Sequence, residues 1–301
     1  MRLAVLAAAL LAAAPVTPLP TSALRVKVGG SWRTWWSSDR APISWTGDAT
    51  LAGALRWTPG ADGIEWTEVQ LAGSGEAWRT RLVVARIDPA RVRLSLDTAF
   101  TAEPRRPRWS ADDAPTDALL AVNAGQFLHT MPWGLVVLDG REMLPAGTGP
   151  LSSALVSDRT GRLHWAHGDA ALRVREEGTS WAFQSYPTLL RAGHVPEPLR
   201  GDVGLVDVRH RDARAAIGTT ADGQLLVAIT RFDGLGGRLG FVPFGLTVPE
   251  MAAVMGALGA RDAVMLDGGI SAQLMVRERA GEARVWKGVR RVPLGLVARA
   301  R

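Results

Sequence analysis

The chain has 301 residues, a formal net charge of +6 and no cysteine. The lack of cysteine excludes disulfide bonds, thiolate metal sites and a lipid-modified N-terminal cysteine. Nearly all the positive charge is arginine, and no run combines basic residues with base-stacking aromatic residues, so we expect no nucleic-acid partner.

The N-terminus is typical of a secretory signal peptide. A short start containing Arg2 is followed by an apolar run over residues 4–14. This run is shorter than the ~20 residues that a membrane-spanning helix needs, and no later stretch reaches that length without charges. We therefore predict a signal peptide over residues 1–23, its removal, and an exported protein, periplasmic or extracellular, without a membrane span.

Residues 24–60 are rich in tryptophan, serine, glycine and proline and show no sustained periodicity. This composition predicts an arm or a loosely structured extension. Its tryptophans could stack on sugar rings, but such residues more often pack onto a domain surface, which is the interpretation we prefer.

The remaining chain, residues 61–301, is predicted to form one core domain. Alternating hydrophobicity and turn signals predict many short strands. They cover residues 64–71, 79–87, 92–96, 118–122, 135–138, 225–229, 263–266, 274–277 and 293–298, with weaker candidates at 163–165 and 172–174. One helix is expected at 248–258, because Thr247 and Glu250 form a capping-box pattern before it and Gly259 follows. The fold class is α+β: a mostly antiparallel mixed sheet with a few helices.

Two of the predicted strands end in polar residues beside glycine. The strand at 263–266 runs into Asp267, Gly268, Gly269 and, after Ile270, Ser271. A buried strand should not end in a carboxylate unless that group closes a turn or performs chemistry. The strand at 118–122 similarly ends in Asn123, the only asparagine of the chain.

No Ser–His–Asp relay and no histidine pair at metal-ligand spacing can be found in the sequence. The strand-end polar groups are Asn123, Gln184, Arg214, Asp267 and Ser271. Arginine matches phosphate oxygens in a bidentate way, and a carboxylate can act as base, nucleophile or cation stabiliser at an anomeric carbon. Together these residue types suit a sugar that carries a phosphate.

Four blocks of the chain, in order, resemble the phosphodiester glycosidase family. They are NAGQF with PWGLVV (123–127 and 132–137), QSYPTLL (184–190), RAAIGTTADGQLLVAIT (214–230) and LTVPEMAAVMGALGARDAVMLDGGISAQLMV (246–276). The resemblance extends over roughly residues 62–298 and implies a glycosidase that hydrolyses a sugar C1–O–phosphate bond on a glycan or a sugar phosphate. Two departures, Ile270 for the third glycine of the turn and Tyr186 for the glycine before Pro187, leave the sugar open.

The resemblance also implies roles for single residues. Asp267, Asn123 and Arg214 are the expected catalytic residues, with Asp267 on the anomeric side and Arg214 on the phosphate. The remaining candidates are expected to contact substrate or allow its close approach: Gly125, Gln184, Gly268, Gly269, Ser271 and His129. Structural alternatives remain: Asn123 and Asp267 could close turns, Arg214 could form an ion pair in a hairpin, and His129 could be a partly exposed loop residue.

Two other functions stay open at this stage. The protein could bind cell-wall or exopolysaccharide glycans without cleaving them, using the N-terminal tryptophans. It could also be a phosphodiesterase that cuts the P–O bond with a divalent metal ion at Asp267. The expected partner is a carbohydrate or sugar-phosphate substrate, no cofactor is required by the sequence, and the oligomeric state is not predicted.

Overall fold

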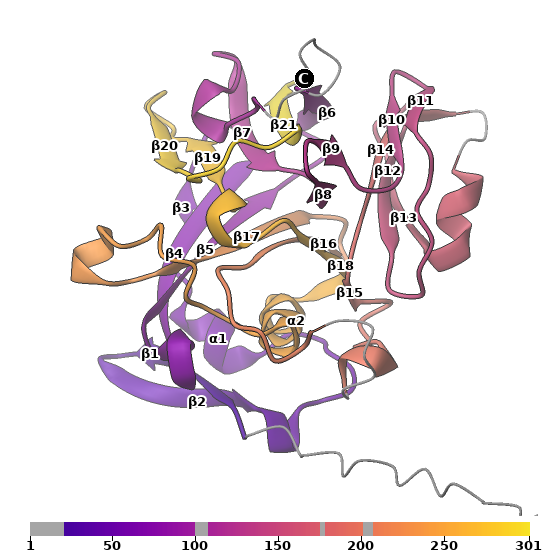
Figure 1. Cartoon of the computed structure of the whole chain (residues 1–301). Coiled ribbons are helices and arrows are strands. Elements are labelled where there is room, and N and C mark those ends of the chain that lie inside the picture. The colour runs from indigo at the N-terminus through magenta and orange to yellow at the C-terminus, as the bar shows by residue number, and fades with distance from the viewer. Residues whose placement is uncertain (1–20, 100–107, 175–177, 201–206) are drawn as a thin grey trace, which may run out of the picture.

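The computed structural model describes residues 21–99, 108–174, 178–200 and 207–301 (Figure 1). The predicted signal peptide therefore lies almost entirely outside the described residues. Every strand pairing in the described residues is antiparallel, and the strands form three sheets and one small hairpin. The antiparallel prediction is confirmed, and helices contribute less than the α+β class suggests.

The largest sheet has nine strands and carries the candidate site at one end. Its order is β15-β18-β16-β17-β5-β4-β1-β2, with β3 paired to β4. The bounds are β1 Ala23–Val28, β2 Ser31–Ser37, β3 Thr58–Pro59, β4 Ile64–Gly73, β5 Thr80–Ile87, β15 Thr188–Leu190, β16 Ala215–Thr220, β17 Leu225–Phe232 and β18 Ala260–Leu266.

Two five-stranded sheets and a hairpin complete the fold. One has the order β11-β10-β14-β12-β13, the other β20-β19-β7-β21-β6, and β8 pairs with β9. The bounds are β6 Val92–Thr98, β7 Ala118–Asn123, β8 Phe127–Leu128, β9 Met131–Pro132, β10 Val136–Leu138, β11 Arg141–Leu144, β12 Ser153–Asp158, β13 Leu163–His167, β14 Thr179–Ser185, β19 Leu274–Arg277, β20 Ala283–Trp286 and β21 Leu294–Ala300.

The two faces of the nine-stranded sheet bury different cores. On one face, Ile217, Val227 and Val264 pack with residues of the two smaller sheets, which lie above and beside the sheet in Figure 1. On the other face, the helices α1 (Ala49–Ala54) and α2 (Val248–Ala257) cover the sheet. Adjacent residues of a strand point to opposite faces of the sheet. Because both faces of these strands are buried, the strands appear in the sequence as continuous apolar runs.

The predicted helix is confirmed as α2. The hydroxyl of Thr247 accepts from the Glu250 amide, and the Glu250 carboxylate accepts from the Thr247 amide, which completes the capping box. Capping satisfies two amides that the helix itself leaves unpaired. Met251 and Met255 are fully buried against the sheet, as the helical spacing predicts.

Residues 24–60, expected to form an arm or loosely structured extension, are instead integrated into the sheet and core. Leu24 and Val26 are buried while Arg25 and Lys27 point outward, a period-two pattern that lets β1 pair with β4. Trp36 and Trp45 are buried, and Trp45 packs against α2, where a side chain on Gly256 would collide with its ring. The expectation that these tryptophans pack holds for this pair, whereas Trp32 is exposed.

Most other strand predictions are confirmed within a few residues, including β4, β5, β7, β18 and β19. The weak strand expected at 172–174 is wrong, since residues 168–173 form a 3-10 helix. No helix in the described ranges is both long and apolar enough to cross a membrane.

Candidate functional site

The candidate site lies at one end of the nine-stranded sheet, where several of its strands begin or end. β18 ends next to Asp267, β16 starts after Arg214, and β15 starts after Tyr186-Pro187. The register pairs Ala215 with Leu266, and the Met265 amide donates to the Pro187 carbonyl at 3.0 Å. These antiparallel pairings bring segments that are far apart in sequence to the same end of the sheet.

Asp267 is held by its main chain and by one hydroxyl. Its amide donates to the Gly125 carbonyl at 2.9 Å, and its carbonyl accepts from the side-chain amide of Asn123 at 2.8 Å. Burial raises the pKa of the Asp267 carboxyl to about 6, while a hydrogen bond from Ser271 and the charge of Arg290 oppose the rise and the charge of Asp212 adds to it. At neutral pH the group is mainly a carboxylate, and it protonates only slightly below that range.

The glycines after Asp267 are required by the chain itself. A Cβ on Gly268 would lie 2.5 Å from the Ala213 carbonyl oxygen, and one on Gly269 would lie 2.9 Å from Asp212 Oδ2. Gly269 also has a φ of 56° and donates its amide to the Ala213 carbonyl at 2.6 Å. Paired glycines allow close approach either of a ligand or of another piece of backbone, and in the structure the approaching group is the 212–213 segment.

Asn123 and Gln184 use their side-chain amides on the main chain. Asn123 is 1% exposed, and its Oδ1 accepts from the Gln273 amide at 3.1 Å. Gln184, also buried, accepts from the amides of Leu135 and Gly147 and donates to the Gly147 carbonyl, all within 3.0 Å. The side chain of Asn123, expected to be catalytic, thus holds the Asp267 turn, and that of Gln184, expected to contact substrate, holds the main chain at Leu135 and Gly147.

Arg214 is likewise buried among backbone carbonyls. Its Nε donates to the Leu246 carbonyl at 2.8 Å and its Nη2 donates to the His210 carbonyl. Burial lowers the pKa of Arg214, and the nearby charge of Asp212 opposes this effect. The guanidinium thus ties residues 210 and 246 together. A second, more accessible arginine acts on the charge of Asp267.

Arg290 is that more accessible arginine, and the sequence analysis did not single it out. It is exposed, its guanidinium carbon lies 5.1 Å from the centre of the Phe127 ring, and its charge lowers the pKa of Asp267. Its amide and that of Val289 donate to the Ile270 carbonyl at 3.0 and 2.8 Å, which attaches this loop to the Asp267 turn. The sequence shows only a basic stretch here, without a signal that separates Arg290 from its neighbours.

Asp212 is a second carboxylate that the sequence did not reveal. Its Oδ1 is buried and has no hydrogen-bond partner among the described residues, although a buried carboxylate oxygen normally has one. Burial raises the pKa of Asp212, and the charges of Arg214 and His210 oppose the rise. His210, which is exposed, places its Nε2 3.8 Å from Asp212 Oδ2.

The other predicted residues surround this centre. Ser271 is buried and hydrogen-bonded to Asp267. Gly125, with a φ of 69°, accepts at its carbonyl oxygen from the Asp267 amide, and a Cβ there would lie 3.2 Å from the Gln184 carbonyl oxygen. His129 is exposed at the tip of the β8–β9 hairpin with a φ of 55°.

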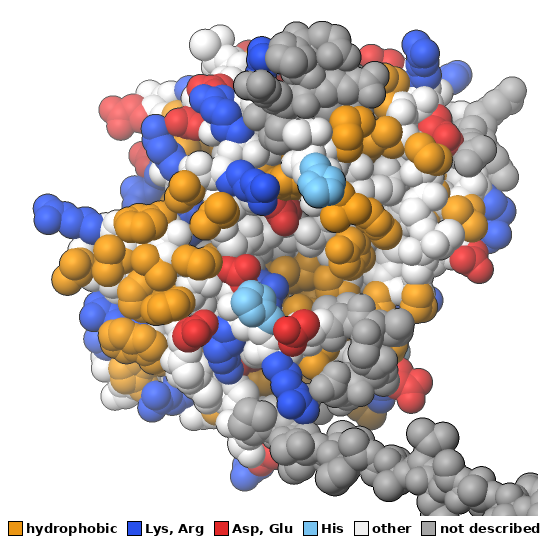
Figure 2. Space-filling model, in the orientation of Figure 1, with side chains coloured by type: hydrophobic (Ala, Val, Ile, Leu, Met, Phe, Trp, Pro, Cys, Tyr) orange, Lys and Arg blue, Asp and Glu red, His pale blue; other side chains and the backbone are white. Residues whose placement is uncertain are grey.

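Hydrophobic side chains flank this polar centre. On the viewed face, Figure 2 shows a hollow that contains acidic, basic and histidine side chains and has hydrophobic side chains on both sides. On the β15 side, the rings of Trp133 and Tyr186 meet edge to face at 4.6 Å. Gln126 joins this pair to the Asp267 turn, because its side chain donates to the Tyr186 carbonyl and its carbonyl accepts from the Trp133 amide.

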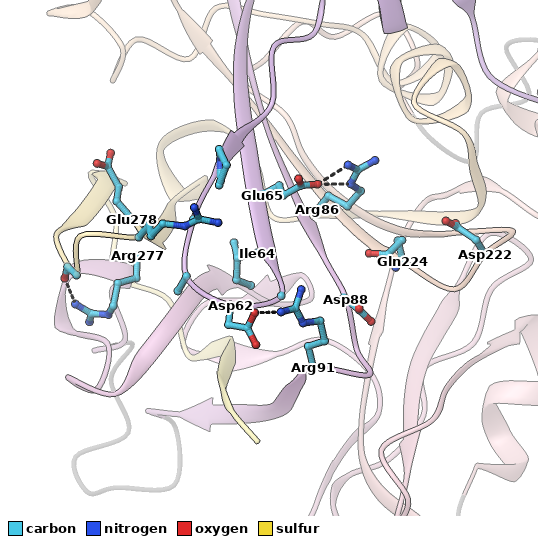
Figure 3. Close-up of a pocket in the computed structure, with 16 residues that line it drawn as sticks. Asp62, Ile64, Glu65, Arg86, Asp88, Arg91, Asp222, Gln224, Arg277 and Glu278 are labelled. Carbon is cyan, nitrogen blue, oxygen red and sulfur yellow. Dashed lines mark hydrogen bonds and ion pairs between the residues drawn. The ribbon is translucent and has the colours of Figure 1, made fainter.

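A different cavity, of about 840 Å³, lies at the opposite end of the nine-stranded sheet (Figure 3). Two ion pairs lie in it, Arg86 with Glu65 and Arg91 with Asp62. None of the predicted site residues lines it. A β-strand of six residues such as β16 spans about 20 Å, so this cavity is separate from the Asp267 site.

In the described part of the chain, no three His, Cys, Asp or Glu side chains come together in an arrangement that could hold a metal ion. The site thus consists of two carboxyl groups with raised pKa values, a nearby arginine and aromatic walls. Glycosidases generally use two carboxyl groups, so the residue types of this site suit that class of enzyme.

Comparison with known proteins gives the family. The sequence profile described as phosphodiester glycosidase matches residues 116–299, and the chain belongs to this family. No curated protein sequence matches the chain. Among solved structures, the fold is similar to the zebrafish N-acetylglucosamine-1-phosphodiester alpha-N-acetylglucosaminidase catalytic domain, auto-inhibited by its pro-peptide, with a TM-score of 0.61, 15% identity, and 88% of this chain and 92% of that one covered.

A second similar structure is a hypothetical protein from Synechocystis, with a TM-score of 0.51 and 15% identity. The match covers 92% of this chain and 68% of that chain. At this identity both likenesses concern the fold alone, and the residues of the site have to be argued from this chain.

Proposed function

We propose that the protein hydrolyses the bond between the anomeric carbon of a sugar and the oxygen of a phosphodiester. The observation that carries this proposal is Asp267, a carboxyl group at a strand end with a pKa raised to about 6 and an arginine close by. Family membership supports the glycosidase class. The products are the free sugar and a phosphate monoester.

Asp267 acts on the anomeric side in this proposal. Positive charge develops at the anomeric carbon in the transition state, and a carboxylate next to it stabilises that charge or attacks the carbon. The hydrogen bond from Ser271 fixes the carboxylate, and the main-chain bonds to Gly125 and Asn123 fix its position. Ser271 and Asn123 are thus positioning residues.

Arg290 binds the phosphate in this proposal, in place of Arg214. A phosphodiester leaves as a weakly basic anion, so its departure depends more on positive charge near the phosphate than on a strong general acid. Arg290 is exposed and electrostatically coupled to Asp267, whereas the guanidinium of Arg214 is used by two carbonyls.

Asp212 supplies the second carboxyl group that glycosidases generally use. Because this leaving group needs little protonation, we assign Asp212 to the attacking water, with His210 beside it. The buried Oδ1 of Asp212 has no hydrogen-bond partner among the described residues. In this proposal it accepts a hydrogen bond from a water or a sugar hydroxyl.

Glycan binding without cleavage is the second candidate, and the pair formed by the half-buried Trp133 and the exposed Tyr186 favours it. Flat aromatic rings with polar edges are good platforms for sugar rings. Of the N-terminal tryptophans, Trp36 and Trp45 are buried in the core, and Trp32 remains exposed for such binding.

Both candidates can be separated with a panel of sugar-1-phosphodiesters, including nucleotide sugars. Wild-type protein should release free sugar from at least one member, and Asp267→Asn should lower kcat/KM on the order of 100-fold or more. Asp222→Asn, a surface carboxylate at the far end of the sheet, is the matched control and should retain activity. Binding of a glycan without turnover of any panel member would favour the second candidate.

We also propose that the protein is exported, on the basis of residues 1–23. Expression of the full chain in a bacterial host should give a periplasmic or secreted product that begins near residue 24. N-terminal sequencing of that product checks the cleavage, and a cytoplasmic product that retains Met1 would contradict it.

A further inference from the structure

A cluster of apolar side chains, most of them exposed, lies at the same end of the nine-stranded sheet as Asp267. β16, β17 and β5 follow β18 across the sheet. At this end of the sheet, Asp267 follows β18, Phe232 ends β17 and Trp78 precedes β5. The register puts Arg214, Thr230 and Leu82 level with Asp267, so Leu82 of β5 lies three strand spacings of about 4.8 Å, roughly 14 Å, from it. Trp78 lies four residues beyond Leu82.

The cluster consists of Trp78, Phe232, Leu235, Phe241 and Phe244. The Phe232 ring makes edge-to-face contacts with Trp78 at 5.8 Å and with Phe244 at 5.4 Å. Leu235 is 73% exposed, Trp78 54%, Phe241 53% and Phe244 39%. Phe232 itself is 7% exposed, so the exposed members are the other four. Several large exposed apolar side chains in one region are typical of a binding surface.

The cluster is attached to the candidate site through the main chain. The Ala213 amide donates to the Pro243 carbonyl at 2.8 Å, and the Ala213 carbonyl accepts from the Gly269 amide at 2.6 Å. Asp212 and Leu246 exchange main-chain hydrogen bonds of 3.2 and 2.9 Å. The loop with Phe241 and Phe244 therefore borders the segment that lies against the Asp267 turn.

The chemistry of the cluster differs from that of the opposite wall. Between residues 234 and 249 the only charged residue is Arg238, and Leu235, Phe241 and Phe244 offer no hydrogen-bonding side chain to a sugar hydroxyl. Trp133 and Tyr186, on the other side of Asp267, do carry polar edges. The site thus has one wall suited to a sugar and one suited to hydrocarbon, with the acid between them.

We propose that the phosphodiester substrate carries a hydrocarbon aglycone, so that the substrate class is a glycosyl-1-phosphoryl lipid. This inference rests on the proposed function. The sugar lies on the Trp133–Tyr186 side, the phosphate at Arg290, and the lipid chain on the cluster. Water adds its hydroxyl to the anomeric carbon, the C1–O bond breaks, and its electron pair stays on the oxygen of a lipid phosphate monoester, while the proton of the water passes to Asp212 and then to solvent.

A binding experiment tests the hydrocarbon wall without requiring turnover. Dodecyl phosphate and butyl phosphate share one head group, and titration of each into the full protein below the micelle concentration should give at least about 10-fold tighter binding of the longer chain. The double variant Phe241→Ser/Phe244→Ser should reduce that ratio to about 2. Ile43→Ser, an equally exposed apolar residue elsewhere, should leave the ratio unchanged.

An activity experiment then separates the failure of this inference from the failure of the proposed function. Wild type is compared on two substrates with one sugar and either a butyl or a dodecyl aglycone. A preference for dodecyl that Phe241→Ser/Phe244→Ser abolishes supports the inference. Hydrolysis of both substrates at equal rates, with equal binding of the two alkyl phosphates, overturns it and leaves the proposed function standing.

Two further outcomes are equally decisive. Tight, cluster-dependent binding of dodecyl phosphate with no hydrolysis of either substrate would retain a lipid-phosphate site and reject the proposed function. Sedimentation that shows wild type as a dimer and the double variant as a monomer, without any chain-length preference, would assign the cluster to a second copy of the chain and overturn the inference.

Discussion

The side-chain amide of Asn123 donates a 2.8 Å hydrogen bond to the main-chain carbonyl of Asp267, a residue 144 positions later in the chain. On its other side, the Asn123 oxygen accepts from the Gln273 amide at 3.1 Å. One buried amide thus fixes both ends of the 267–273 turn to β7. The position of Asp267 therefore depends on a residue of a different sheet.

Replacement of Asn123 by Asp should therefore destabilise the protein and impair activity together. A carboxylate oxygen in place of the amide nitrogen would face the Asp267 carbonyl without a proton to share, and an unsatisfied buried group costs about 1–3 kcal/mol. Urea unfolding and kcat/KM measured on the same samples check this. Loss of activity with unchanged stability would show instead that Asn123 contacts the substrate.

Replacement of Asp267 by Asn should stabilise the protein at neutral pH. The pKa of the carboxyl is about 6 in the folded state and 3.8 as its ordinary value, so the folded state binds the proton more tightly. Ionisation thus disfavours folding by up to about 3 kcal/mol, fully above pH ~6 and not at all below pH ~4. The stability gain of Asp267→Asn in urea unfolding should appear at pH 7.5 and vanish near pH 4; a loss of stability at pH 7.5 would contradict the raised pKa.

The acid limb of the pH–rate profile should respond in opposite directions to two charge changes. If the Asp267 carboxylate is the active form, kcat/KM falls as pH drops through about 6. Asp212→Asn removes a charge that raises this pKa, so the limb should move to lower pH; Arg290→Gln removes a charge that lowers it, so the limb should move to higher pH. Asp222→Asn serves as the control, and identical profiles for all variants would uncouple both residues from Asp267.

A methyl group at Gly268 should displace the Asp267 turn. The Cβ of Gly268→Ala would lie 2.5 Å from the Ala213 carbonyl oxygen, a main-chain atom that cannot rotate away. We expect a loss of roughly 1–3 kcal/mol of unfolding free energy together with loss of activity. Gly53→Ala, in α1 with no atom within 4 Å of the new Cβ, should instead be neutral or stabilising by about 0.5–1 kcal/mol. Equal behaviour of the two variants in thermal unfolding would contradict the close packing of the turn.

Local signals predicted local structure well. The capping box at Thr247 and Glu250 and the apolar spacing after it are sufficient to predict α2. The change from an apolar run to a carboxylate predicted the end of a strand before Asp267, and β18 does end at Leu266. The resemblance of four separate blocks to one family was also readable, since each block carries its own turn and strand pattern.

Relationships between distant segments could not be read in the same way. β1 is buried only because it pairs with β4, about forty residues later, and its alternation extends over just four residues. Arg214 and Gln184 have the residue types of ligands, but their partners are backbone carbonyls and amides supplied by other elements. Asp212 and Arg290 acquire their significance from their distance to the Asp267 turn, which no spacing in the sequence encodes.

The most direct test of the account is hydrolysis of a sugar-1-phosphodiester in oxygen-18 water, followed by mass spectrometry of both products. With Asp267 acting at the anomeric carbon, the label should enter the free sugar and be absent from the phosphate monoester. Label in the phosphate would show attack at phosphorus and would contradict the proposed chemistry of this site.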